Sequence, residues 1–282
     1  MFFERTVLLI IKSVCSVKNE LHRNAIRKTW ANSTYIASNK LNVTVDRVFS
    51  LGNCELEHAQ TSLASEHTVH NDILQWGFVD SYWNLTLKVV GQLAYVHRKR
   101  PEITHIFAGD DDVFVNILGI INLIESEEPS NQQTIFKGSV IASGKTMRNP
   151  ESKFFVPEWL YPDFRYPAYA GGGGFLYSKK IANELFFASF DTKMLNMEDA
   201  FVGLLLKKIG RKPVLDDRFV IRSCMKSESV EKLRLAEQGC YWSEILLYHK
   251  LNYTQLLEVW NVFVNLEDCQ NEMKRHEPQC GE

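Results

Sequence analysis

The feature that most constrains the fold is a run of three aspartates at the end of an apolar segment. Ile103–Ala108 reads as a buried strand, and Asp110–Asp112 stand between it and the apolar Val113–Val115. Adjacent carboxylates repel one another, so this position favours a cation. Mg²⁺ and Mn²⁺ take oxygen ligands, commonly one or two carboxylates with substrate phosphates. Because alternate side chains of an extended segment share a face, Asp110 and Asp112 are the candidate ligands. The alternative is an exposed acidic turn.

Strand and helix signals alternate through the first half of the chain. Thr6–Val14 and Ile103–Ala108 are continuous apolar runs, which are typical of strands covered on both faces. Val45–Leu51 reads as another strand, and Asn19–Ala31 and Asn84–His97 read as helices. The alternation predicts an α/β fold with a mainly parallel central sheet flanked by helices. Ligands of such sheets bind beyond the carboxyl ends of the strands, where the aspartates stand.

The second half has a different pattern, and no linker separates it from the first. Residues 143–169 are rich in aromatic residues and prolines and read as a long ordered loop, which in a compact domain is usually functional. Phe175–Ser178 reads as a strand, and Lys179–Ala188, Glu198–Ile209 and Leu256–Val264 read as helices. His58–His70, in the first half, fits a helix or a loop. We expect one domain over residues 1–282.

Two further segments are candidates for chemistry. Glu198 and Asp199 open a helix, where acidic residues stabilise the helix dipole, but one of them could equally be a general base. Gly171–Gly174 are flanked by Tyr169 and other aromatic residues. They form either a flexible turn or a wall without side chains against which a sugar ring fits, and we favour the wall. His249 alone reads as an ordinary surface or core histidine.

The net charge and the cysteine content limit the binding partners of the protein and the cellular compartment in which it is expected. The formal net charge is -2, which gives no general attraction to nucleic acid or to an anionic membrane. Val7–Ile11 is too short an apolar run to span a membrane. Six cysteines and four N-x-S/T sequons (Asn32, Asn42, Asn84 and Asn252) favour a secretory compartment. We expect at least one disulfide, between Cys15 and Cys54, since each follows a predicted strand.

Five segments in order resemble a known family. Arg23–Trp30 reads RNAIRKTW, Asp72–Lys88 reads DILQWGFVDSYWNLTLK, Gly109–Val115 reads GDDDVFV, Tyr166–Ser178 reads YPAYAGGGGFLYS, and Glu198–Gly203 reads EDAFVG. Together they resemble the β-1,3-glycosyltransferases of glycosyltransferase family 31. The glycine run is more similar to the β-1,3-N-acetylglucosaminyltransferase branch than to the galactosyltransferases.

The resemblance implies a GT-A type fold, which is Rossmann-like, and a Mn²⁺-dependent, inverting hexosyltransferase. Its donor would be a UDP-sugar and its acceptor a glycan on a glycoprotein or glycolipid. The implied location is the Golgi lumen, as a type II membrane protein whose anchor would precede Met1. On this reading residues 1–115 form the nucleotide-sugar half and residues 116–282 the acceptor half. A UDP-galactose-dependent β-1,3-galactosyltransferase stays open as an alternative.

The resemblance also implies roles for single residues. Asp110, Asp112 and His249 match the metal site, with Asp112 the most direct ligand, and Asp199 matches the catalytic base. The positions on the donor side are Arg27, Asp72, Lys88 and Asp111. The positions on the sugar and acceptor side are Tyr169, Gly171, Gly172, Gly173, Gly174 and Glu198.

Two other classes of function remain open at this point. A silent sugar-binding relative would keep the fold and lose the base, but Asp199 and the three aspartates of the metal motif are intact. A metal-dependent phosphodiesterase could also use an acidic cluster. It would usually need ligands for a second ion, and the sequence offers none of clear spacing.

Overall fold

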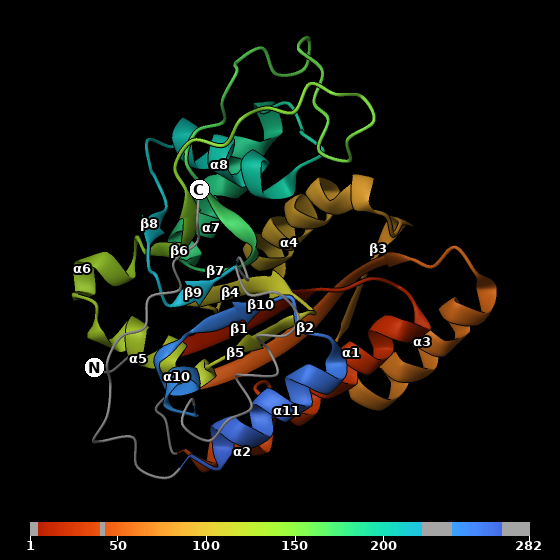
Figure 1. Cartoon of the computed structure of the whole chain (residues 1–282), viewed down its shortest axis with the longest axis vertical. Coiled ribbons are helices and arrows are strands. Elements are labelled where there is room, and N and C mark those ends of the chain that lie inside the picture. Colours follow the sequence, from red (N-terminus) through yellow and green to blue (C-terminus); the bar gives the residue numbers. More distant parts are fainter. Residues whose placement is uncertain (1–4, 40–42, 222–238, 267–282) are drawn as a thin grey trace.

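The computed structural model describes residues 5–39, 43–221 and 239–266 (Figure 1). Its strands are β1 (Arg5–Lys12), β2 (Val43–Asn53), β3 (Ile73–Val79), β4 (His105–Asp110), β5 (Val113–Val115), β6 (Phe136–Ile141), β7 (Tyr169–Ser178), β8 (Val214–Leu215), β9 (Phe219–Val220) and β10 (Leu247–His249). Its helices are α1 (Val17–Lys28), α2 (Ser33–Ser38), α3 (Glu57–His70), α4 (Leu85–Lys99), α5 (Ile117–Ser126), α6 (Pro129–Gln132), α7 (Lys179–Ala188), α8 (Glu198–Lys208), α10 (Gly239–Glu244) and α11 (Tyr253–Val264), with 3-10 turns η1 (Tyr82–Asn84) and η2 (Ser189–Asp191).

The central sheet has seven strands in the order β3-β2-β1-β4-β7-β6-β8, beside a three-stranded sheet in the order β5-β10-β9. Strands β3, β2, β1 and β4 are parallel neighbours, and β7 runs antiparallel between β4 and β6. Helices cover both faces (Figure 1). The mainly parallel α/β sheet expected from the sequence is therefore confirmed, and both halves of the chain contribute to it.

Strand β1 has an apolar core sequence because both of its faces are buried. Val7, Leu9 and Ile11 face one core, which α1, α5 and α11 complete. Leu8 and Ile10 face the second core, which contains residues of α4, α7 and α8. All five side chains are fully buried, so neither face of the strand tolerates a polar residue.

The two sheets meet where the aspartates lie. In the central sheet Lys12 at the end of β1 pairs with Asp110 at the end of β4. In the small sheet β10 runs antiparallel to β5, with His249 opposite Val113. A histidine 137 residues after Asp112 in sequence is thus brought beside the aspartate run by strand pairing.

The glycine run lies inside a strand. Sequence patterns predicted a strand only at Phe175–Ser178, but β7 begins at Tyr169 and includes all four glycines. Glycine has a low strand propensity. The strand is nevertheless held on both sides of the run, because Gly174 pairs with Gly109 of β4 and Ala170 pairs with Val140 of β6. Residues 142–168 between β6 and β7 contain no helix or extended strand, as expected for the long loop, and only isolated bridges cross it.

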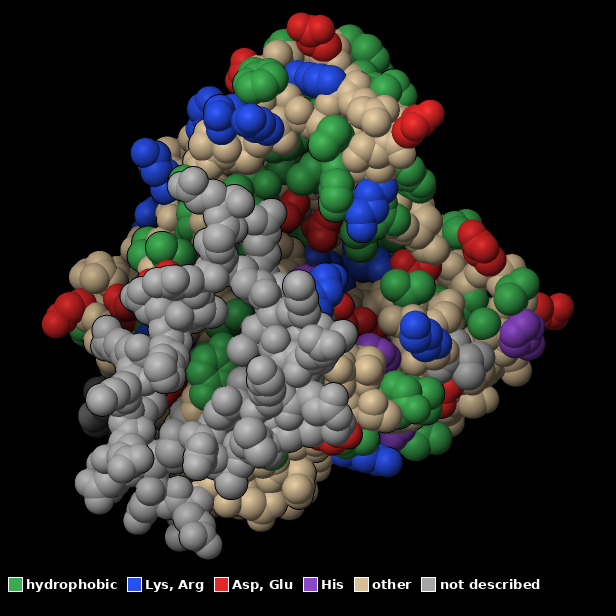
Figure 2. All heavy atoms as spheres, viewed as in Figure 1, with side chains coloured by type: hydrophobic (Ala, Val, Ile, Leu, Met, Phe, Trp, Pro, Cys, Tyr) green, Lys and Arg blue, Asp and Glu red, His purple; other side chains and the backbone are tan. Residues whose placement is uncertain are grey.

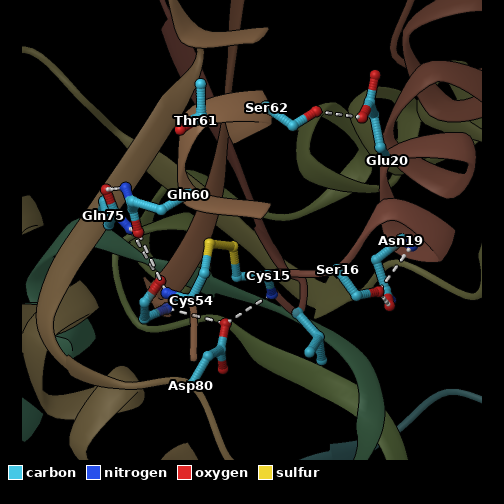
Figure 3. Close-up of a disulfide and its surroundings, with 12 residues drawn as sticks. Cys15, Ser16, Asn19, Glu20, Cys54, Gln60, Thr61, Ser62, Gln75 and Asp80 are labelled. Atoms are coloured by element: carbon cyan, nitrogen blue, oxygen red, sulfur yellow. Dashed lines mark hydrogen bonds between the residues drawn. A yellow bond between two sulfur atoms is a disulfide. The ribbon is translucent and has the colours of Figure 1, made fainter. Parts of the chain in front are cut away.

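A disulfide joins the loops that follow β1 and β2 (Figure 3). Cys15 and Cys54 have Cα atoms 5.1 Å apart, and this pairing confirms the expected one. Asp80 links the same two loops, because its Oδ2 accepts hydrogen bonds from the backbone N–H groups of Cys15 (3.0 Å) and Gly52 (2.9 Å). Cys224, Cys269, Cys280 and the sequon at Asn42 lie outside the described residues.

Among the described residues, no helix is both long enough and apolar enough to cross a membrane.

Candidate active site

The carboxyl edge of the central sheet holds a group of three possible metal ligands. Asp110 ends β4, Asp112 precedes β5 and His249 ends β10. The Nε2 atom of His249 lies 3.1 Å from Oδ1 of Asp112 and 3.6 Å from Oδ2 of Asp110. Two neighbouring ligands of an octahedral ion, each about 2.1 Å from it, stand about 3 Å apart. The spacing of the three groups therefore fits a divalent metal.

The hydrogen bonds of this group also fit a metal. Oδ1 of Asp112 and Nε2 of His249 are buried, and within the described chain neither has a hydrogen-bond partner. Nδ1 of His249 lies 3.3 Å from the carbonyl oxygen of Ile221. A carbonyl can only accept, so this contact is a hydrogen bond when Nδ1 carries a proton. In the neutral ring that arrangement leaves the Nε2 lone pair available to a metal. Gly173 makes room for the ring, since a Cβ there would lie 2.7 Å from it.

Asp111 points the other way. Its Oδ2 accepts hydrogen bonds from Ser13 Oγ at 2.5 Å and from Asn19 Nδ2 at 2.9 Å. These partners lie on the loop after β1 and on α1, and burial raises the pKa of Asp111. Asp111 and Asp112 form the turn between β4 and β5 and not the extended segment expected from the sequence. Asp110 and Asp112 nevertheless both face His249, while Asp111 fastens α1 to the strand end.

Lys12 connects the metal group to a second pair of acids. Its Nζ lies 3.0 Å from Oδ1 of Asp110 and 2.7 Å from Oε1 of Glu198, and it donates to the carbonyl of Gly172 at 3.3 Å. Burial opposes the charge of Lys12, but the two carboxylates outweigh it and raise the pKa. Burial likewise opposes ionisation of Glu198, yet Lys12 holds the pKa of that carboxyl below its usual range. Lys12 and Glu198 are therefore an ion pair.

Asp199 differs from its neighbour Glu198 although both open α8. Burial, followed by the negative charge of Glu198, raises the pKa of Asp199 to about 6. Its Oδ1 accepts a hydrogen bond from the N–H of Ala200 (2.8 Å). A carboxylate with a pKa near working pH suits a general base. Asp199 lies outside the group of possible metal ligands, so a base at this position would be separate from a metal site.

The four glycines serve different purposes. A Cβ on Gly172 would have only ordinary contacts, with Glu198 Oε1 at 3.4 Å and Asp199 Oδ2 at 3.9 Å, so this glycine faces the acid pair. A Cβ on Gly171 would collide with Ile221, and one on Gly174 with Leu247. Tyr169 is buried. One residue of the run therefore faces the acid pair, and the others allow β7 to pack closely against the small sheet.

The residues expected on the donor side are engaged with protein partners. Arg27 forms two hydrogen bonds to Asp72, at 2.9 and 2.7 Å, and also contacts Glu66 at 2.7 Å. Lys88 is fully buried and donates at 2.8 Å both to Asp80 and to the carbonyl of Ser13. Burial lowers the pKa of Lys88, and Asp80 opposes this shift. Arg27, Asp72 and Lys88 thus brace the loops behind the strand ends.

Sequence reasoning missed Lys12 and Asp80. Lys12 interrupts an apolar strand at its carboxyl end, level with Asp110, and that position was the available signal. The structure brings Lys12 together with Asp110, Asp112, His249, Glu198, Asp199 and Gly172. Acidic, basic and histidine side chains gather in a hollow near the centre of the face in Figure 2.

The fold and the site define a GT-A type protein with a possible divalent-metal group and a separate carboxylate pair. Residues 21–217 match the family model described as "Galactosyltransferase". The chain belongs to this family, and the resemblance to glycosyltransferase family 31 is confirmed.

Relatives with curated names agree with this assignment. The chain is 33% identical over 260 residues to the rat (Rattus norvegicus) "UDP-GlcNAc:betaGal beta-1,3-N-acetylglucosaminyltransferase 7", covering 91% of this chain and 64% of that protein. It is 33% identical to the mouse (Mus musculus) "N-acetyllactosaminide beta-1,3-N-acetylglucosaminyltransferase 2", covering 90% and 62%. It is 29% identical to the human (Homo sapiens) "Beta-1,3-galactosyltransferase 2", covering 85% and 54%. The chain thus spans less than two thirds of the length of each of these relatives.

Proposed function

We propose that the protein is an inverting hexosyltransferase that moves N-acetylglucosamine from a UDP-sugar to a glycan hydroxyl in β-1,3 linkage. The observation that carries the proposal is the division of the site into two parts. Asp110, Asp112 and His249 converge within 4.8 Å of one another, while the carboxylate of Asp199 stands apart. An inverting displacement needs this division, because base and leaving group act on opposite faces of the anomeric carbon.

In this proposal Asp110, Asp112 and His249 hold a divalent cation, Mn²⁺ by family resemblance. The cation supplies electrostatic stabilisation of the departing diphosphate. Asp199 accepts the proton of the acceptor hydroxyl. Lys12 keeps Glu198 ionised and in place, and the charge of Glu198 contributes to the raised pKa of Asp199.

The remaining residues of the site act through position. Arg27, Asp72, Lys88 and Asp111 shape the donor side, since their polar groups hold α1 and the loops after the strands. Tyr169 and Gly171–Gly174 shape the sugar and acceptor side. Residues 1–115 then form the nucleotide-sugar half of one domain, and residues 116–282 the acceptor half.

The donor sugar has one alternative. The named relatives include a β-1,3-galactosyltransferase, so UDP-galactose is the competing donor. UDP release from UDP-N-acetylglucosamine and UDP-galactose, measured side by side with Mn²⁺ and with excess chelator, tests the proposal. We expect release from the first donor and none in chelator. Preference for UDP-galactose would reassign the donor, and full activity in chelator would refute the metal-dependent mechanism.

We also propose the Golgi lumen as the location, with an anchor preceding Met1. The Cys15–Cys54 disulfide supports an oxidising compartment. The sequon asparagines Asn32, Asn84 and Asn252 stand at the N-caps of α2, α4 and α11, and Asn252 is exposed to solvent. A mobility shift on treatment with an N-glycosidase is the expected result, and an unglycosylated protein from a eukaryotic host would count against it.

A further inference from the structure

An aromatic surface lies beside the catalytic pair and leads out to solvent. Tyr82 and Trp83 form η1, just before α4, with ring centroids 5.8 Å apart. Phe154, from the loop of residues 142–168, lies 6.4 Å from Tyr82. Trp83 is 60% exposed and Phe154 is 41% exposed. We call Tyr82, Trp83 and Phe154 the aromatic surface.

Tyr82 connects this surface to the base. Burial, followed by the charges of Glu198 and Asp199, raises the pKa of Tyr82 to about 12. The phenol is therefore within electrostatic reach of both carboxylates. The loop is also fastened to the segment that leads into α8, because Asn196 Nδ2 donates to the carbonyl of Lys153 at 3.3 Å. The hydrogen bond sets Lys153, the neighbour of Phe154, beside Asn196, two residues before Glu198.

The surface is held in place. Lys153 Nζ lies 4.8 Å from the ring centre of Phe154 and 5.5 Å from that of Tyr82, within the range of cation–π attraction. Within the loop, Tyr161 stacks on Tyr166 with centroids 5.1 Å apart. Aromatic side chains fixed in this way bind with little loss of conformational entropy.

The chemistry of the rings indicates their ligand. The face of an aromatic ring carries negative charge and its apolar area is large. A pyranose presents a face of polarised C–H groups, which such a ring attracts, whereas a charged or extended peptide would need donors and acceptors that these three side chains mostly lack.

We propose that Tyr82, Trp83 and Phe154 bind the acceptor glycan by stacking against the sugar next to the one that receives the transferred unit. This rests on the proposed function, in which the acceptor hydroxyl approaches Asp199. The acceptor class is then an oligosaccharide of at least two pyranose units. A monosaccharide acceptor fills only the position at Asp199 and gains nothing from Trp83.

Trp83→Ala and Phe154→Ala test the proposal. The probes are UDP-N-acetylglucosamine with N-acetyllactosamine and, as the monosaccharide, methyl β-galactoside. We expect each variant to raise KM for the disaccharide about tenfold, with kcat nearly unchanged. The KM for the monosaccharide and acceptor-independent UDP release should stay within about twofold of wild type. Trp83→Phe, which keeps an aromatic face, should restore most of the affinity.

Phe190→Ala is the matched control. Phe190 is 65% exposed but packs with Phe186 beside His97, at the other end of α4 and roughly 20 Å from Trp83. This variant should leave both KM values unchanged. An unchanged disaccharide KM in both Trp83→Ala and Phe154→Ala would overturn the proposal.

A binding measurement separates this proposal from the proposed function. Titration of wild type and Trp83→Ala with N-acetyllactosamine, followed by tryptophan fluorescence in the presence of UDP and Mn²⁺, needs no turnover. Binding by wild type that Trp83→Ala weakens would support the stacking surface even if no UDP-sugar were consumed, a result that would defeat the proposed function alone. Equal binding, or none by either protein, would overturn the stacking proposal.

Discussion

Two groups of buried charge lie behind one edge of the sheet, and they differ in how their charges are balanced. In the first, Arg23 and Arg27 bind Glu66, and Arg27 and Arg47 bind Asp72, at N–O distances of 2.5 to 3.0 Å. In the metal group, Oδ1 of Asp112 and Nε2 of His249 are buried 3.1 Å apart, and no other group of the described chain hydrogen-bonds to either atom. The first group is complete without a ligand, and the second is not.

The difference indicates that the arginine network stabilises the fold, whereas the metal group is arranged to bind a ligand. A satisfied buried network costs several kcal/mol to break, because removal of one partner leaves an uncompensated charge. A buried group without a partner lowers the free energy of unfolding of the free protein, and a ligand that satisfies the group raises it again. The two groups are connected, since Arg23 donates to Ser13 Oγ and Ser13 in turn donates to Asp111. The network thus positions the edge on which the metal group stands.

The largest expected effect comes from removing a metal ligand. Asp112→Ala should abolish transfer, a loss of about 10³-fold or more, because the departing diphosphate loses its electrostatic partner. The variant should stay folded, although it loses the contacts with His249 and Lys250 that hold the pKa of Asp112 below its usual range against the effect of burial. Asp217→Asn, at an exposed acid, is the matched control and should behave as wild type. Transfer that persists in Asp112→Ala would remove Asp112 from the site.

The next effect concerns the base. Asp199→Asn keeps the size of the side chain and removes its basicity, so transfer should fall by roughly 10²-fold or more. Glu198 is the alternative candidate for the base. Glu198→Gln should reduce transfer less than Asp199→Asn, because Glu198 is already paired with Lys12. A Glu198→Gln variant that loses transfer, beside an active Asp199→Asn, would exchange the two roles.

Removing a residue of the arginine network should lower the stability of the protein and leave its activity largely unchanged. Arg27→Met leaves Asp72 and Glu66 short of a partner and should cost about 3–5 kcal/mol of unfolding free energy. Lys28→Met, an exposed neighbour on α1, should cost little. The folded fraction of Arg27→Met should retain kcat within a few-fold, measured below its melting temperature. A large fall in kcat without loss of stability would place Arg27 in contact with the donor.

The smallest effect is a pH dependence. Because Asp199 has a pKa of about 6, its carboxylate is protonated below that pH and cannot accept the acceptor proton. The value of kcat/KM should therefore level off above pH 7 and fall about tenfold per unit below pH 6. A profile that stays flat to pH 5 would contradict the assignment of a raised pKa to the base.

Local sequence patterns were sufficient to predict the elements whose side chains are buried on both faces. The apolar run of β1 and the aspartates after β4 identify the parallel sheet and its ligand-binding edge from sequence. Strand β3 was missed because it is an edge strand whose side chains are only partly buried, and α3 stayed undecided because only Ala59, Leu63 and Glu66 of its 14 residues are buried.

Long-range pairing decided what local patterns could not. His249 joins Asp112 only because β10 pairs with β5, and no spacing in the sequence encodes that contact. Family resemblance alone pointed to His249. Lys12 was overlooked because a lysine at a strand end looks ordinary until the register of β1 and β4 sets it beside Asp110.

Calorimetric titration with UDP and Mn²⁺ tests the central claim most directly. The claim is that the metal group binds the nucleotide and Asp199 does not. Wild type and Asp199→Asn should bind UDP with similar affinity, and only when Mn²⁺ is present, although the variant no longer transfers sugar. Asp112→Ala should show no Mn²⁺-dependent binding. Loss of UDP binding in Asp199→Asn, or its retention in Asp112→Ala, would contradict the division of the site into two parts.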